Sequence, residues 1–184
     1  MDGSLLTMLV FLPTLGALAC LLLPKELARG IAVFASVATF LLSLLAIAPF
    51  LGAGDSANAI EIFGSAYGQK LHFVQRIPWI TGQGFTIEYF VGLDGLNLPL
   101  IVLTTFVAML SCIASWNFKS WKVNKGIKAY FILFLLLETG MLGVFVSLDF
   151  FLFYVFWEAM LIPMYLLIGI WGGERRIYAA MKFV

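Results

Sequence analysis

The sequence predicts an all-α integral membrane protein with five complete transmembrane helices, the start of a sixth and a small β-hairpin in a long loop. The first observation is composition: 62% of the 184 residues are hydrophobic and 11% are charged, whereas soluble domains carry about 25% charged residues. The second is a series of apolar runs near the length of a bilayer span, about 20 residues. The third is that Lys and Arg are concentrated in the connections. A soluble monomer could not cover its surface with so few polar groups, so we expect lipid to surround the chain.

Five apolar segments qualify as transmembrane helices. Their approximate bounds are 5–23, 31–51, 96–116, 129–148 and 150–170. The first run is long for a signal peptide and is followed by Pro24-Lys25-Glu26, not by a small-residue cleavage site, so we expect it to be retained. The tail from Ile177 resembles the first turns of a sixth helix and stops without a cap. We therefore expect residues 1–184 to be one membrane domain, the N-terminal fragment of a longer subunit.

The loop over residues 52–93 is too long for a simple turn. Residues 85–91 alternate large apolar side chains with polar ones, as a half-buried strand does. Turn-forming residues at 81–84 precede them, and 72–80 is the candidate partner strand, which Pro78 would restrict to a sheet edge. Two interpretations remain open from composition alone: the aromatic hairpin contacts another subunit, or it lies on lipid headgroups.

The basic residues of the loops indicate the orientation. Eight lie in the first, third and fifth loops: Lys25, Arg29, Lys119, Lys122, Lys125, Lys128, Arg175 and Arg176. The opposite side has Lys70 and Arg76, both in the long second loop. The positive-inside rule therefore predicts a cytoplasmic third loop and an N-terminus outside. The four lysines of the third loop either set this topology or pair with anionic lipid or a partner's acids.

Two carboxyl groups lie inside predicted spans, Glu138 in the fourth and Glu158 in the fifth. Residues 143–173 contain no Lys, Arg or His, and a charged side chain at a bilayer centre costs at least about 2.5 to 3.5 kcal/mol. Glu138 is ten residues before Leu148 and Glu158 ten residues after it. At about 1.5 Å per residue, both lie roughly 15 Å from the same surface, near mid-membrane.

Two acids at one depth on adjacent helices could share a proton or a water-lined cavity if both face inward. Burial and a like-charged neighbour both disfavour the charged form of a carboxyl, and a carboxyl poised between its two forms suits a proton relay. The alternative is a protonated Glu that only holds helices together. An ion pair would need a cation from outside these residues, because the spans contain no Lys or Arg.

Pro163 follows Glu158 by five residues and lacks the N–H that the carbonyl of Ala159 would accept. A freed carbonyl inside a membrane must be satisfied by water or a side chain. The sequence therefore predicts either a loosened, hydrated helix beside the acid or a kink that serves packing only.

Other polar residues carry weaker signals. Asp94 is a candidate N-cap for the third span. Cys20 and Cys112 fall inside apolar runs, so we expect buried thiols and no disulfide. The single His72 lies in a polar stretch, and no metal-binding spacing is present. We expect no catalytic residue, metal or cofactor in the chain and no nucleic-acid partner.

Three stretches together resemble one family. They are VGLDGLNLP at 91–99, FWEAMLIPMYLLIGIWGG at 156–173 and YAAMKF at 178–183. They resemble the antiporter-like M chain (subunit 4 in mitochondria) of proton-pumping NADH:quinone oxidoreductase, respiratory complex I. The match covers most of residues 85–184, and its Trp-Glu-x-Met-Leu-Ile-Pro-Met-Tyr run is specific.

The resemblance implies a fourteen-helix antiporter-like subunit built from inverted five-helix repeats. It implies that Glu158 is central to proton translocation and pairs with a Lys on the seventh helix, which this chain lacks. Glu138 matches a position where many bacterial members also carry an acid. The hairpin matches an element that contacts neighbouring membrane-arm subunits. Flavin and iron–sulfur clusters belong to partner chains in this family.

The resemblance further implies a hetero-oligomer, most simply in a bacterial plasma membrane, that passes electrons to ubiquinone or menaquinone elsewhere in the complex. Mrp-type cation/proton antiporters and membrane-bound hydrogenases carry related chains and are the alternatives. A fragment that only packs lipid and neighbouring helices is a third. The residues around Glu158 favour the complex I chain.

Overall fold

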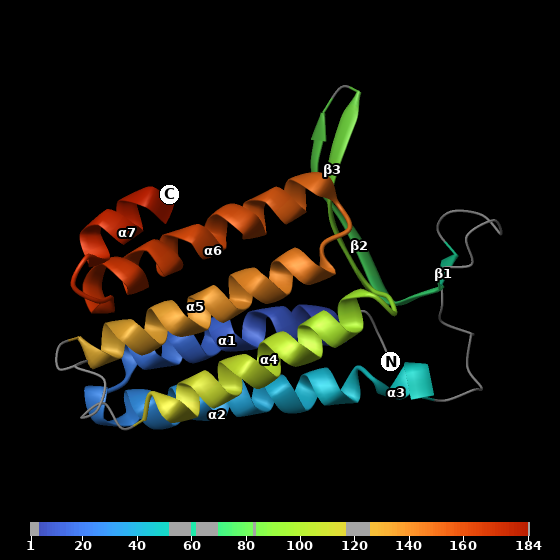
Figure 1. Ribbon diagram of the computed structural model, residues 1–184. Helices are drawn as coiled ribbons and strands as arrows, with labels where there is room; N and C mark the ends of the chain where they lie inside the picture. The colour runs from blue at the N-terminus through green and yellow to red at the C-terminus, as the bar shows by residue number, and fades with distance from the viewer. Residues whose placement is uncertain (1–3, 52–59, 62–69, 83, 117–125, 184) are drawn as a thin grey trace.

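The computed structural model of the chain describes residues 4–51, 60–61, 70–82, 84–116 and 126–183. Five long helices run side by side (Figure 1). They are α1 (Ser4–Leu22), α2 (Lys25–Leu45), α4 (Asn97–Ala114), α5 (Ile127–Val146) and α6 (Phe150–Trp171). All five are long and apolar enough to cross a membrane. The predicted integral membrane protein with five spans is confirmed, and α7 (Arg176–Phe183) lies where the start of a sixth helix was expected.

Four of these helices form one bundle. Helix α1 packs on α2 and α5, and α4 packs on the same two helices. Helix α6 packs on the side of α5 away from α2, and α7 folds back over α6 (Figure 1). We call α1, α2, α4 and α5 the four-helix bundle. Its two ends are the hairpin end, next to the β-strands, and the lysine end, where α2 begins at Lys25 and Lys128 lies in the first turn of α5.

Prolines limit the second helix at both ends. Helix α2 begins at Lys25, directly after Pro24, whereas hydropathy predicted a start near residue 31. Charged side chains at the start of a span can reach water or headgroups, so they do not prevent the helix from forming there. The helix ends at Leu45 because Pro49 has no N–H to donate to the Leu45 carbonyl. The short helix α3 (Ala48–Leu51) follows this break.

The predicted hairpin is present. Strand β2 (Lys70–Gly82) pairs with β3 (Phe85–Leu93) in antiparallel register, with Arg76 opposite Phe90 and Thr81 opposite Thr86. A register shift separates Pro78 and Ile80, so this proline sits at an irregularity, where a ladder tolerates the missing N–H. The two-residue strand β1 (Ile60–Glu61) pairs with the start of β2. Figure 1 shows the hairpin tip projecting beyond the helices.

The base of the hairpin is bonded to the helices. The Thr7 hydroxyl on α1 lies 2.5 Å from Gln75 Oε1 and 3.0 Å from the Tyr89 hydroxyl. The amide of Leu148, between α5 and α6, donates to the Phe90 carbonyl at 2.8 Å. These contacts fix the hairpin to both sides of the bundle.

The core of the bundle has two apolar clusters. One, at the hairpin end, is formed by residues such as Leu6, Leu9, Val10, Val91, Ile101, Leu142 and Val146. The other, at the lysine end, consists of Ala17, Cys20, Ala28, Ala32, Ala35, Cys112, Phe131 and Leu135. On each helix, polar residues that are buried, or partly buried in the case of Thr14, separate the two clusters along the chain. They are Thr14, Ser36, Thr39, Ser43, Thr105, Glu138 and Thr139. We call this set the polar layer.

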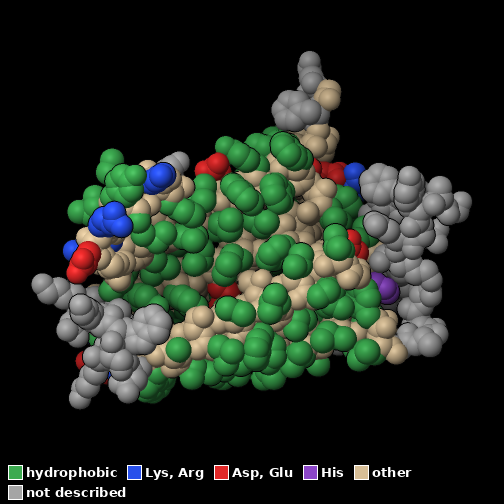
Figure 2. Space-filling model, viewed as in Figure 1, with side chains coloured by type: hydrophobic (Ala, Val, Ile, Leu, Met, Phe, Trp, Pro, Cys, Tyr) green, Lys and Arg blue, Asp and Glu red, His purple; other side chains and the backbone are tan. Residues whose placement is uncertain are grey.

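The outer surface has the pattern of a membrane protein. Hydrophobic side chains cover the broad face in Figure 2, and Lys and Arg gather towards the ends of the helices. Leu22, Phe34 and Phe150 are each at least three-quarters exposed. Such a surface is stable in lipid and unfavourable in water.

Candidate functional site: two carboxyls on opposite faces

Glu158 lies near the middle of α6 and is exposed on the surface of the described chain. It lines a hollow of about 580 Å³ between α6 and α7. The other lining side chains are Leu161, Ile162, Tyr165, Leu166 and Met181. Tyr154, one turn earlier, is a hydrogen-bond neighbour of the Glu158 carboxyl. The hollow therefore presents one carboxyl in apolar surroundings.

Pro163 lies inside α6, as predicted, and its side chain is buried. The carbonyl of Ala159 has no N–H partner at residue 163 because proline lacks one. Ala159 is itself exposed and adjacent to Glu158. The carbonyl of Ala159 therefore loses its helical donor next to Glu158 in the sequence, while the proline ring itself is buried in the protein.

Glu138 lies in the middle of α5 and is completely buried. The Ser36 hydroxyl on α2 donates to Glu138 Oε2 at 3.4 Å. Ser36 also lies within hydrogen-bonding reach of the Cys112 thiol on α4. Within the described residues, Glu138 Oε1 has no hydrogen-bond partner. The side chain therefore points into the four-helix bundle.

The two carboxyls do not face each other, which corrects the idea of a shared inward cavity. Helix α5 turns Gly140 and Gly143 towards α6, where a Cβ on Gly140 would lie 2.6 Å from Met160 Cβ. Glu138 precedes Gly140 by two residues, or about 200° of helix rotation. Glu158 likewise lies two residues from both Phe156 and Met160, the α6 residues that meet these glycines. Both acids therefore point away from the α5–α6 contact, in opposite directions.

Hydropathy could not reveal this arrangement. It located both acids inside their spans, but hydropathy does not show which way a side chain faces when the helix is apolar all round. The polar neighbour of Glu138 that the sequence did not predict is Ser36. Its signal is weak but readable: Ser36, Thr39 and Ser43 recur at helical spacing on one face of an otherwise apolar segment.

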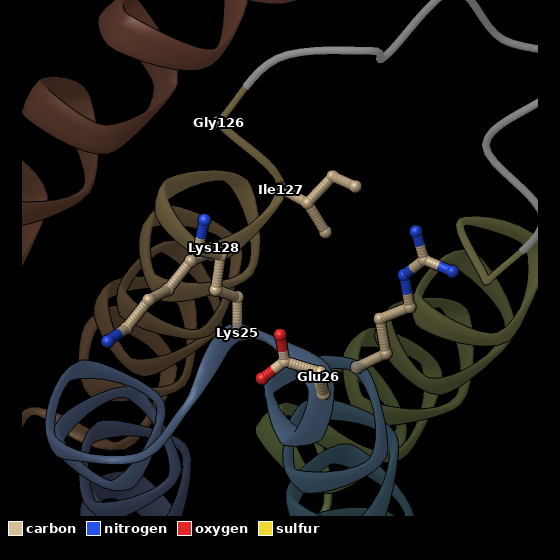
Figure 3. Close-up of a pocket in the computed structure, with 6 residues that line it drawn as sticks. Lys25, Glu26, Gly126, Ile127 and Lys128 are labelled. Atoms are coloured by element: carbon tan, nitrogen blue, oxygen red, sulfur yellow. The ribbon is translucent and has the colours of Figure 1, made fainter.

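The lysine end holds a second pocket, of about 560 Å³ (Figure 3). Lys25, Glu26 and Arg29 of α2 line it together with residues 126–128. Lys128 Nζ donates to the carbonyl oxygens of Leu21 at 2.8 Å and Leu23 at 3.0 Å. It thus satisfies free carbonyls at the end of α1. Lys119, Lys122 and Lys125 lie outside the described residues.

Leu96, not the candidate Asp94, is the residue directly before α4, but the Asp94 side chain accepts hydrogen bonds from the amides at the start of the helix. Its Oδ1 accepts from Leu96 N at 2.8 Å and Asn97 N at 2.7 Å. Asn97 Oδ1 accepts in return from Asp94 N at 2.8 Å, a reciprocal arrangement of the capping-box type. Cys20 and Cys112 are free buried thiols, as predicted. In the part of the chain that the structure describes, no group of three His, Cys, Asp or Glu residues could hold a metal.

Comparison with known proteins matches two families over successive parts of the chain. The family described as "NADH-ubiquinone oxidoreductase chain 4, amino terminus" matches residues 78–145. The family described as "NADH:quinone oxidoreductase/Mrp antiporter, TM" matches residues 147–184.

Individual relatives are chains of the same type. NADH-quinone oxidoreductase subunit M of Rhodobacter capsulatus is 40% identical over 98% of this chain and 32% of its own length. NADH-ubiquinone oxidoreductase chain 4 of Prototheca wickerhamii is 38% identical over 98% of this chain and 34% of its own length. The chain thus spans about a third of the length of these relatives.

Solved structures show the same fold. A chain of respiratory complex I from Thermus thermophilus matches 95% of this chain and 31% of its own length, with 27% identity and a TM-score of 0.69. A chain of an archaeal membrane-bound sulfane sulfur reductase has a TM-score of 0.70 at 22% identity, which is a likeness of fold alone. The sequence and fold together show that the chain belongs to the family of M chains (chain 4) of NADH:quinone oxidoreductase and corresponds to an amino-terminal portion of that family.

Proposed function

We propose that the chain is part of a membrane-arm subunit of a respiratory NADH:quinone oxidoreductase and takes part in proton translocation driven by redox chemistry in other subunits. One observation carries this proposal. Glu158 is a carboxyl near the centre of a 22-residue apolar span, turned into a hollow whose other lining residues are mainly apolar. Intramembrane carboxyls in such positions are typical of proton relays.

Glu158 is the group that takes up and releases the proton. Its carboxyl is reached from the hollow between α6 and α7, not from the α5 side. Tyr154 can help bind the water that delivers a proton, because its hydroxyl is a hydrogen-bonding group beside the acid. Residues 143–173 hold no Lys, Arg or His, so a cationic partner for Glu158 would come from another part of the sequence or from another subunit.

We also propose that proton transfer and electron transfer take place in different subunits. The chain moves protons and holds no redox centre, while flavin and iron–sulfur clusters lie in partner subunits. The complex sits in a bacterial plasma membrane, with the hairpin end outside and the lysine end in the cytoplasm. The bacterial relatives and the excess of loop cations at the lysine end support this placement.

The test is Glu158→Gln in the full-length subunit, assembled in its complex in inverted membrane vesicles. Gln keeps the size of the side chain and cannot release a proton, so we expect NADH-driven proton uptake to fall by about a hundredfold or more, in the range of general acid–base effects. Glu174→Gln is the matched control, because this exposed acid lies in the α6–α7 connection. We expect it to leave pumping unchanged.

If Glu158→Gln pumps protons as fast as the wild type, Glu158 is not the proton relay. The Mrp-type alternative predicts a different result with the unaltered protein: cation/proton exchange in vesicles with no dependence on NADH. Proton uptake that requires NADH and a quinone supports the proposed complex over that alternative.

A further inference from the structure

The polar layer of the four-helix bundle contains an acid that the Glu158 pathway does not use. Glu138 is fully buried, one oxygen accepts a single long hydrogen bond from Ser36, and the other has no partner among the described residues. An ionised carboxylate needs a cation or several donors when it is buried. The titratable groups that face it are the thiol of Cys112 on α4 and, beyond that thiol, Cys20 on α1. This environment favours the neutral acid.

The side of α5 that meets α6 closes the route to Glu158. Gly140 and Gly143 press against Met160 and Phe156 there, with no space for an added Cβ. Apolar contacts of this kind leave no room for water. A proton on Glu138 must therefore leave by another route.

A row of buried hydroxyls leads from Glu138 towards the hairpin end. Ser36, Thr39 and Ser43 are fully buried and lie on one face of α2. Ser43 is bonded to Thr105 of α4 at 2.8 Å. Successive members rise by about 4.5 to 6 Å along the helix, a gap that one water molecule can bridge. We call Ser36, Thr39 and Ser43 the hydroxyl row.

We propose that Glu138 is a proton-binding site of its own, which exchanges its proton with the hairpin end of the bundle through the hydroxyl row and not with the Glu158 face. Each hydroxyl accepts a proton on its oxygen and passes its own proton onward, so each keeps one proton, and its O–H bond rotates back before the next transfer. The inference does not depend on the proposed role of Glu158, because it can be tested without NADH turnover.

The first test is infrared spectroscopy of the purified complex with the full-length subunit at neutral pH. We expect a carbonyl band of a protonated carboxyl that shifts in D₂O, is absent from Glu138→Gln and is retained in Glu158→Gln. If Glu138→Gln leaves every such band in place, the site does not bind a proton at neutral pH and the proposal is overturned.

The second test measures how fast that band shifts after transfer to D₂O. Thr39→Val removes the middle hydroxyl at nearly equal volume, and we expect exchange to slow by about fivefold, the factor that corresponds to one net hydrogen bond. Thr14→Val is the matched control, because Thr14 is bonded to Thr139 at 2.8 Å and lies outside the row. Equal rates in wild type and Thr39→Val, or equal slowing in both variants, would overturn the proposed route.

Discussion

At the scale of single residues, Asn97 joins three elements through one amide. Its Nδ2 donates to the carbonyls of Gly92 in β3 at 3.0 Å and Phe145 in α5 at 3.1 Å, and its Oδ1 accepts from Asp94 N. The residue is also part of the first turn of α4. One side chain thus sets where the hairpin, α4 and α5 meet.

We expect Asn97→Asp to destabilise the full-length protein by about 1 to 3 kcal/mol, because it replaces two buried donated hydrogen bonds by an acceptor facing two carbonyls. Asp94→Asn is the control, since its Oδ1 can still accept from the amides of Leu96 and Asn97. The measurement is thermal unfolding in detergent. Equal melting of the two variants would show that the Asn97 contacts contribute little.

At the scale of helices, α5 and α6 are held by close contact between small and large residues. Gly143 faces the ring of Phe156, and Gly140 faces Met160, so the helices approach where α5 has no side chain. Small residues allow this approach in membranes, where the hydrophobic effect does not drive helices together.

Gly143→Val should therefore separate α5 from α6 and cost about 1 to 3 kcal/mol, as overpacking does. Gly169→Ala is the comparison, because a Cβ there would lie 3.7 Å from Ala180 Cβ, an ordinary contact. Adding Phe156→Leu to Gly143→Val should recover part of the loss. A double-mutant cycle on unfolding free energies measures the coupling, and zero coupling would contradict direct contact.

The same two helices show what the sequence could and could not predict. Length and hydropathy located α5 and α6 and placed both acids inside them, because a span needs a fixed number of apolar residues. They could not tell which way Glu138 or Glu158 faces, since lipid and protein core are both apolar and a helix between them has no polar stripe. The hairpin was predictable because its apolar and polar residues alternate and so distinguish the two faces of a strand, whereas α5 and α6 have no such pattern.

At the scale of the whole molecule, the hairpin is docked on the bundle as a separate unit. Its base is held by polar contacts to Thr7 and by the backbone bond between Leu148 and Phe90. Its outer part exposes Ile77, Trp79 and Ile80, with Trp79 6.4 Å from the Phe151 ring at the start of α6. An apolar projection with a fixed base is suited to contact with a neighbouring subunit or with lipid headgroups.

The docking should weaken at alkaline pH. Burial raises the pKa of Tyr89, and its hydrogen bond with Thr7 partly lowers that pKa. Because the folded pKa is above the unfolded one, the folded state holds its proton longer. This contribution to stability is complete below about pH 10, the usual pKa of tyrosine, and is lost as pH rises through the folded pKa.

We expect Tyr89→Phe to remove this part of the alkaline loss of stability, because Phe has no proton to release. The variant also lacks the bond to Thr7, so below pH 10 it should be less stable than wild type by about 1 kcal/mol. Thermal unfolding in detergent at several pH values measures both effects. Thr7→Val serves as the control, since it removes the same bond and keeps the phenol that titrates. If wild type and Tyr89→Phe lost stability in parallel from neutral to alkaline pH, another group would be responsible, and the Tyr89 contact would not control how the hairpin docks on the bundle.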